Sequence, residues 1–168
     1  ANDGTTDDSL TLGGGNDRVI TSAAQLSATL TLNAGNGSDV LEISSDATLV
    51  DGQLAGVSNL ETLRLAADAD DDAQSVTLGA AAAAAGLVIL DASTAGADDD
   101  VSVDTTAFTN TLQIALGAGD DEVVLGSGGS QVNAGDGDNL IVVGAANDGS
   151  ADDVIVSGAG DDRARLTD

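Results

Sequence analysis

The chain has 168 residues, of which 29 are acidic and four are basic, giving a formal net charge of −25. It has no His, Cys, Pro, Met, Trp or Tyr, all four basic residues are Arg, and Phe108 is its only aromatic residue. The absence of His and Cys excludes zinc sites of the usual nitrogen and sulfur type, thiol nucleophiles and Ser-His-Asp triads. The charge would repel nucleic acid and anionic lipid. The longest uncharged apolar stretch, residues 80–90, is too short and too rich in Ala to span a bilayer.

The acidic residues are nearly all Asp, with 26 Asp against three Glu. Val, Ile, Leu and Phe make up only about 24% of the chain, and so little hydrophobicity with so much charge normally favours disorder. The length fits a single domain spanning residues 1–168, which we expect to be a segment of a longer protein. Folding would require positive charge that the chain does not carry, so an external cation is the first hypothesis.

One short pattern recurs along the chain: Gly, any residue, Gly, a small polar residue and Asp, followed by a run of aliphatic residues. In chain order the copies occupy residues 13–20, 35–41, 95–101, 117–125, 135–141 and 158–164. The third copy is degenerate, and the fifth has Asn in place of the Asp. The key positions are 22 residues apart between Asp17 and Asp39 and between Asp99 and Asp121, and then 18 and 23 apart.

Each copy predicts a Gly-rich turn followed by a short strand, because Gly permits tight turns and aliphatic residues suit a pleated core. Strands are predicted at residues 40–43, 76–78, 87–90, 101–103, 112–116, 123–125, 140–143 and 154–156. Residues 51–65 predict a turn and an alternating strand, and Ala80–Ala85 is compatible with a short helical insertion. Repeats of 18 to 23 residues predict an all-β, parallel β-roll or β-solenoid of roughly eight coils.

The chemistry of the turns suits Ca²⁺, which takes six to eight oxygen ligands from carboxylates and backbone carbonyls. A Gly-rich turn exposes carbonyls and its Asp projects a carboxylate, so the turns of stacked coils would form two halves of a cage. A half-step of nine residues places Ser130 between two copies, and Asp148 and Asp152 compete for one later position. The candidate calcium ligands are Gly13, Gly15, Asp17, Gly35, Gly37, Asp39, Asp99, Gly117, Gly119, Asp121, Gly135, Gly137, Asn139, Asp148, Asp152, Gly158, Gly160 and Asp162.

These Gly-Asp units resemble the calcium-binding nonapeptide repeats of secreted bacterial RTX proteins, whose pattern is G-G-x-G-x-D-x-U-x. The clearest matches are residues 13–20, 35–43, 117–125 and 158–165. Residues 57–63 and 78–87 also look like segments of bacterial surface-layer and giant RTX-type surface proteins. The resemblance implies a right-handed β-roll that binds several Ca²⁺ ions, an extracellular location at a bacterial cell surface, and export by type I secretion.

The acidic residues also have other interpretations. Any single Gly-Asp unit can be a solvated turn, and the Asp runs 70–72 and 98–100 are expected to be solvated faces. An EF-hand is excluded because Ala73 stands where that loop needs Gly and no Glu closes it. We expect no enzymatic activity, because exposed Asp pairs in turns lack the apolar pocket that raises the pKa of one carboxyl in a glycosidase. Phe108 is expected to be a core plug or an interface contact.

The sequence thus predicts a calcium-dependent structural module of a secreted bacterial surface protein: a surface-layer, matrix-filament or adhesin-stalk unit. Such a module would fold as it binds metal and self-associate through open β edges. Its partners would be calcium and copies of itself or neighbouring repeats, without nucleic acid or membrane insertion. Two alternatives stay open: a calcium-dependent module that binds polysaccharide or a receptor, and the secretion-and-folding tail of an RTX enzyme.

Overall fold

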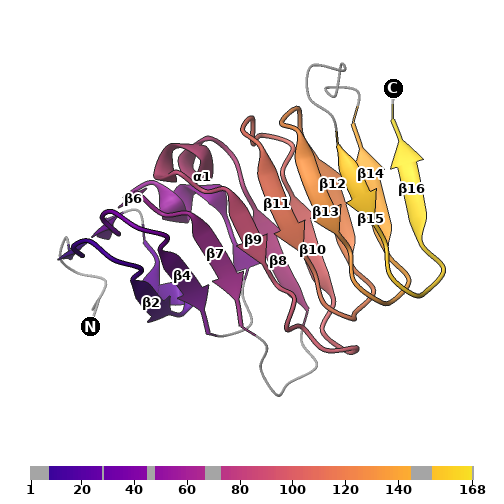
Figure 1. Cartoon of the computed structure of the whole chain (residues 1–168), viewed down its shortest axis with the longest axis horizontal. Coiled ribbons are helices and arrows are strands. Elements are labelled where there is room, and N and C mark those ends of the chain that lie inside the picture. Colours follow the sequence, from indigo (N-terminus) through magenta and orange to yellow (C-terminus); the bar gives the residue numbers. More distant parts are fainter. Residues whose placement is uncertain (1–7, 28, 45–47, 67–72, 145–152, 168) are drawn as a thin grey trace.

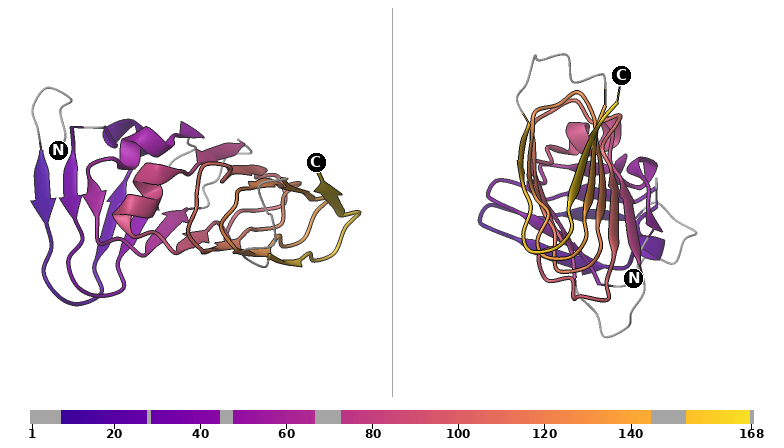
Figure 2. Two further views of the ribbon diagram at one scale, coloured as in Figure 1. Left: turned by 90° about the horizontal axis from the view of Figure 1, so that it is seen from above. Right: turned by 90° about the vertical axis from the view of Figure 1, so that its right-hand side faces the viewer.

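The computed structural model of the chain describes residues 8–27, 29–44, 48–66, 73–144 and 153–167, and it is a parallel β-solenoid. Figure 1 shows the strands following one another along the long axis, with the two termini at opposite ends. Viewed from the C-terminal end in Figure 2, the later coils nearly superimpose. The predicted all-β solenoid is therefore confirmed.

The strands form three sheets, and every pairing between strands is parallel. The N-terminal sheet has the order β1-β3-β6, the long sheet β15-β13-β11-β9-β7-β4-β2, and the C-terminal sheet β16-β14-β12-β10-β8-β5. The strands are β1 (Ser9–Thr11), β2 (Arg18–Thr21), β3 (Thr31–Asn33), β4 (Val40–Ile43), β5 (Thr48–Leu49), β6 (Val57–Ser58), β7 (Thr62–Leu65), β8 (Gln74–Thr77), β9 (Ile89–Asp91), β10 (Val101–Asp104), β11 (Leu112–Ala115), β12 (Glu122–Leu125), β13 (Ser130–Asn133), β14 (Leu140–Val143), β15 (Val154–Val156) and β16 (Arg163–Leu166).

The solenoid makes about six turns, so the prediction of roughly eight coils was wrong. Some coils are longer than the repeat spacing indicated: Thr62 pairs with Ile89 across α1 and Thr48 pairs with Ser75 across η2, each 27 residues on. The inserted elements are the 3-10 helices η1 (Ala23–Gln25) and η2 (Asp51–Leu54) and the helix α1 (Ala80–Ala85).

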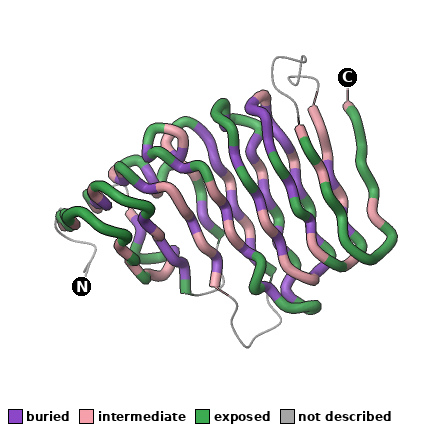
Figure 3. The backbone as a smooth tube through the Cα atoms, viewed as in Figure 1, coloured by how far each residue is buried: buried purple, intermediate pink, exposed green. Residues whose placement is uncertain are grey.

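The core is a stack of aliphatic side chains between the sheets. On the long sheet, Leu41, Leu63 and Leu90 are in register on neighbouring strands, and each is 0% exposed. On the C-terminal sheet, Val76, Val103 and Val123 form the matching row. Strand residues alternate between buried and exposed (Figure 3), as expected for a strand with one face in the core. Phe108 is buried in the same core, which confirms its expected role as a core plug.

The Ala-rich insertion is a helix whose start is fixed by an earlier coil. Six consecutive Ala residues favour a helix, but one so short is not stable alone. The carboxylate of Asp51 accepts hydrogen bonds from the amides of Gly79 (2.7 Å), Ala82 (2.9 Å) and Ala81 (3.0 Å). Helix α1 packs on η2 and β6 and ends at Gly86, whose φ is 100°. No helix among the described residues is long and apolar enough to cross a membrane.

Replacing Asp51 by Ala should destabilise the fold, because three amides at the start of α1 lose their acceptor. We expect a loss of about 1 to 3 kcal/mol in the free energy of unfolding, measured with urea in saturating calcium. The control is Glu122→Ala on an exposed strand position, which removes the same charge. Equal losses in the two variants would contradict the capping role.

Candidate metal centre

The Gly-Asp turns form two stacks on opposite sides of the long sheet. Turns 12–17 and 34–39 lead into β2 and β4 of the long sheet and make up the first turn stack. Turns 92–100, 116–121, 134–139 and 157–162 follow β9, β11, β13 and β15 of that sheet and make up the second turn stack. Because the strands are parallel, their starts lie on one side and their ends on the other. The repeat motif alone placed all the copies in one series and did not predict their separation into two stacks.

In the first turn stack, a buried side chain of each coil accepts a hydrogen bond from the backbone of the coil before it. The amide of Asp17 donates to Oδ1 of Asp39 at 2.7 Å, and the amide of Asp39 donates to Oε2 of Glu61 at 2.8 Å. Asp39 is only 1% exposed. These carboxylates replace the backbone carbonyls that a continuous parallel ladder would supply, so they hold successive coils together.

The second turn stack repeats this bond at three levels. The amide of Val101 donates to Oδ1 of Asp121 (2.8 Å), that of Asp121 to Oδ1 of Asn139 (2.9 Å), and that of Asn139 to Oδ1 of Asp162 (3.1 Å). Asn139 additionally donates from Nδ2 to the carbonyl of Gly137 at 3.3 Å. An amide side chain can therefore occupy this place as well as a carboxylate.

Ser130, at the half-step, makes the same kind of bond to the next coil. Its amide donates to Oδ1 of Asp153 at 2.7 Å, on the side of the long sheet where the first turn stack lies. The sequence had Asp148 and Asp152 competing for this position, and both lie outside the described residues. Asp153 was missed, although it directly precedes β15, as Asp39 precedes β4 and Asp121 precedes β12.

A second, exposed row of side-chain bonds runs in the opposite direction. The amides of Asp120, Asp138 and Asp161 each donate at 2.8 Å to a carboxylate of the preceding coil, from Asp100, Asp120 and Asp138 respectively. The paired Asp residues of a turn thus have separate roles. One points outward and binds the next coil, and the other points inward and binds the previous coil.

Asp99 is not in register with Asp121, contrary to the predicted spacing of 22. Ser102 pairs with Glu122, so the level of Asp121 corresponds to Val101, which is 20 residues earlier. Asp99 instead accepts a hydrogen bond from the amide of Gly96 at 2.7 Å within its own turn. The reason is that turn 92–100 is longer than the turns that follow it.

The predicted Gly residues allow the turns to stack closely. A Cβ atom at Gly35 would lie 2.0 Å from the carbonyl oxygen of Gly13, and one at Gly135 would lie 1.7 Å from that of Gly117. Gly37, Gly117, Gly119, Gly137, Gly158 and Gly160 show the same close approach to the preceding turn, whereas Gly13 and Gly15 have nothing within 4 Å. Close packing of backbone on backbone therefore requires glycine at these positions, whether or not a metal is bound.

Several inward carboxylates are only half satisfied. Oδ2 of Asp17, Asp39 and Asp121 is buried and has no hydrogen-bond partner, and the same holds for Oδ2 of Asp8. Burial raises the pKa of Asp121 to about 7, and the charges of Asp100 and Asp120 add to this although the Val101 amide opposes it. The expectation that the neighbouring Asp residues of the turns are exposed was therefore wrong for Asp99 and Asp121, which are 6% and 2% exposed.

The long sheet, unlike the turns, pairs its carboxylates with Arg side chains. On its outer face, Glu42 is 6% exposed and accepts a hydrogen bond from Nε of Arg18 at 2.9 Å. Arg64 lies beside Glu42 and pairs with Asp91 at 2.9 Å. Burial would raise the pKa of Asp91, but hydrogen bonds from Ser93 and Arg64 outweigh it and leave that pKa below its ordinary value. The sheet supplies Arg to its buried carboxylates, whereas no Arg pairs with those of the turns among the described residues.

The turns contain carboxylate and carbonyl oxygens, the ligands that Ca²⁺ prefers, but their carboxylates are not gathered into clusters. The Gly residues of one turn lie against backbone carbonyls of the turn before it, as Gly35 lies against Gly13, and the inward side chain accepts a hydrogen bond from the preceding coil. No group of three or more acidic side chains among the described residues is arranged to hold a metal ion. A cation in these turns would therefore take backbone carbonyls as most of its protein ligands.

Comparison of the chain with protein-family models, curated proteins and solved structures finds no match.

The stacking of the turns predicts unequal effects of equivalent Gly→Ala substitutions. Gly37→Ala should lower the free energy of unfolding by more than about 3 kcal/mol or prevent folding, because its Cβ would overlap the carbonyl oxygen of Gly15. Gly15→Ala is the matched control, since it occupies the same place in the repeat and also has a positive φ, but has open space around it. Thermal unfolding followed by circular dichroism distinguishes the two, and equal effects would contradict the stacking.

Asp121→Asn should stabilise the calcium-free protein at pH 8. The raised pKa means that wild type loses stability as pH rises from about 4 to about 7, whereas the neutral amide does not titrate. Asn139 shows that Asn keeps the hydrogen bond. We expect a gain of about 2 kcal/mol, roughly half of what 1.36 kcal/mol per pKa unit would give, because the calcium-free turn can relax around the charge. The gain should vanish at pH 4 in urea titrations, and a loss at pH 8 would refute this account.

Proposed function

We propose that the chain is a calcium-dependent structural module of a secreted bacterial surface protein, in which Ca²⁺ bound in the two turn stacks stiffens the solenoid. The observation that carries the proposal is the set of buried Oδ2 atoms of Asp17, Asp39 and Asp121 that have no partner. An uncompensated buried carboxylate oxygen is costly, and a cation or a proton must offset that cost. Carbonyl and carboxylate oxygens, with no nitrogen or sulfur ligand in the chain, favour calcium over zinc.

The distribution of charge supports the same conclusion. All four Arg lie in strands, where they are matched by four acidic residues: Glu42, Asp91, Asp104 and Glu122. Another 15 acidic residues of the described part of the chain lie outside the strands, where none of the four Arg lies. The sheets are thus electrically balanced by the chain itself, whereas the turns depend on ions from solution.

Within this proposal the residues have defined tasks. Bound Ca²⁺ would supply positive charge between carboxylates of successive coils. Asp39 and Asp121 would each offer Oδ2 while Oδ1 keeps its bond to the preceding coil. Asn139 offers only a neutral oxygen, so the level it occupies should bind calcium more weakly. Calcium is abundant outside cells, where modules of millimolar or submillimolar affinity are loaded, which fits the resemblance to secreted surface proteins.

Calcium titration after chelation tests the proposal. The β signal in circular dichroism and the thermal midpoint should rise with Ca²⁺. The free energy of unfolding should rise by about 1.4 kcal/mol per site at a calcium concentration of ten times the dissociation constant. Mg²⁺ at equal concentration should stabilise the protein less. The double variant Asp39→Asn, Asp121→Asn should respond less to calcium, whereas Glu122→Gln, with one charge removed on a sheet face, should respond as wild type does.

A chelated protein with the β signal and thermal midpoint of the calcium-loaded protein would refute the metal requirement. Light scattering in the same titration examines the structural role. Growth of ordered assemblies with calcium supports a surface-layer, filament or stalk unit. Calcium-dependent folding that leaves a monomer even at high concentration would refute self-assembly and favour a binding module or a secretion tail.

A further inference from the structure

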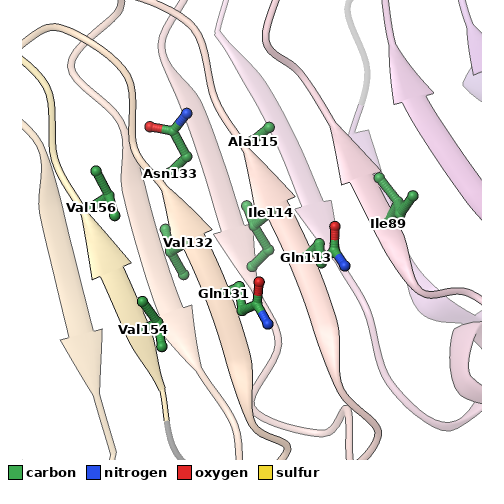
Figure 4. Close-up of a pocket in the computed structure, with 9 residues that line it drawn as sticks. All are labelled: Ile89, Gln113, Ile114, Ala115, Gln131, Val132, Asn133, Val154 and Val156. Atoms are coloured by element: carbon green, nitrogen blue, oxygen red, sulfur yellow. The ribbon is translucent and has the colours of Figure 1, made fainter.

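A neutral groove lies on the outer face of the long sheet. It has a volume of about 270 Å³ and crosses strands β9 to β15 (Figure 4). The surface is formed by Gln113, Ala115, Gln131, Asn133, Val154 and Val156, and we call it the amide face. None of these residues is charged, although the chain carries −25. Val154 and Val156 are 53% and 56% exposed.

From this face we infer that a second copy of the chain packs against it, sheet face to sheet face. This goes beyond the proposed function, because it names the surface and the geometry of assembly. Charge limits which face can take part. The carboxylates without an Arg partner lie in turns at the two ends of the strands, so two copies approach closely with least repulsion through an uncharged sheet face.

The residue pattern of the amide face is self-complementary. Ile89, Gln113, Gln131 and Val154 are in register on neighbouring strands, so two amides lie between two aliphatic residues. A two-fold axis along the strands, between β11 and β13, reverses this order in the second copy. Gln113 then faces Gln131 of the second copy, where each amide both donates and accepts, and Ile89 faces Val154.

The neighbouring row obeys the same symmetry. Ala115 is in register with Asn133, so in the pair a small side chain faces a larger one. Asp91 and Val156 stand at the two ends of this row. Asp91 is already paired with Arg64 and with Ser93, so it brings no unbalanced charge to the interface.

The area sets the strength of this contact. Four strands about 4.8 Å apart and three residues long give a face of about 200 Å², far below the roughly 800 Å² per partner of a standard stable interface. One contact is therefore weak, and it becomes effective where many copies are held side by side at high local concentration.

Site-specific cross-linking tests the arrangement. Because the chain has no native Cys, only the introduced Cys can react. The variants are Gln113→Cys, Gln131→Cys and, as control, Ser102→Cys on the exposed face of the C-terminal sheet. Packed sheets are about 10 Å apart, beyond the reach of a disulfide, so a short bis-maleimide is the reagent. All reactions are run at high protein concentration in calcium, after circular dichroism has established folding.

The two-fold axis predicts that a mixture of Gln113→Cys and Gln131→Cys cross-links at least about tenfold faster than Ser102→Cys alone, and faster than either Gln variant alone. Equal rates for all of them would overturn the inference, and so would fastest linking of Gln131→Cys to itself. Sedimentation equilibrium gives a second readout, in which Gln131→Asp should abolish concentration-dependent association and Ser102→Asp should not. Association unchanged by Gln131→Asp would refute the interface while leaving calcium-dependent folding intact.

Discussion

Backbone amides that emerge where a turn interrupts a parallel ladder must find acceptors, and in this solenoid side chains of the next coil provide them. The bond from the Asp17 amide to Asp39, and its equivalents at Asp121 and Asp153, determine much else. Because Asp side chains are short, these bonds form only between coils that lie close together. At that distance only glycine fits in the facing turn. The acceptors are mostly carboxylates, so the bond also buries negative charge. Asp-rich composition, Gly-rich turns and the proposed need for cations thus share one cause.

The carboxylates of the fold occur in two different surroundings. On the long sheet, where side chains of neighbouring strands lie side by side, Arg18 and Arg64 reach Glu42 and Asp91 and no ion is needed. In the turns, a long Arg side chain would have to share a small space with backbone on both sides. Under the proposed function small mobile ions offset these charges, and the supply of such ions varies with the surroundings. The sheets would therefore keep a constant charge, whereas the turns would change theirs with the solution.

The sequence predicted the fold class because strand length, glycine and Asp all recur together. It did not predict the strand β3, whose residues Thr31–Asn33 are partly polar, or the assignment of turns to two sides of the long sheet. Side depends on how many strands precede a turn within its coil, and the local motif carries no trace of that number. Asp153 was missed for a similar reason, since no Gly-x-Gly precedes it. What marks it is its place directly before a strand.

The buried side-chain bonds also have a polarity along the chain. In the bonds of the inward Asp and Asn side chains, the acceptor comes from the later coil and the amide from the earlier coil, as between Asp121 and Val101. A stack that grows toward its C-terminus leaves its newest inward amide without this acceptor. A stack that grows toward its N-terminus meets each incoming amide with an acceptor already in place. The inward ladder therefore favours growth toward the beginning of the chain, whereas the exposed row of Asp100, Asp120 and Asp138 has the opposite polarity and favours growth toward its end.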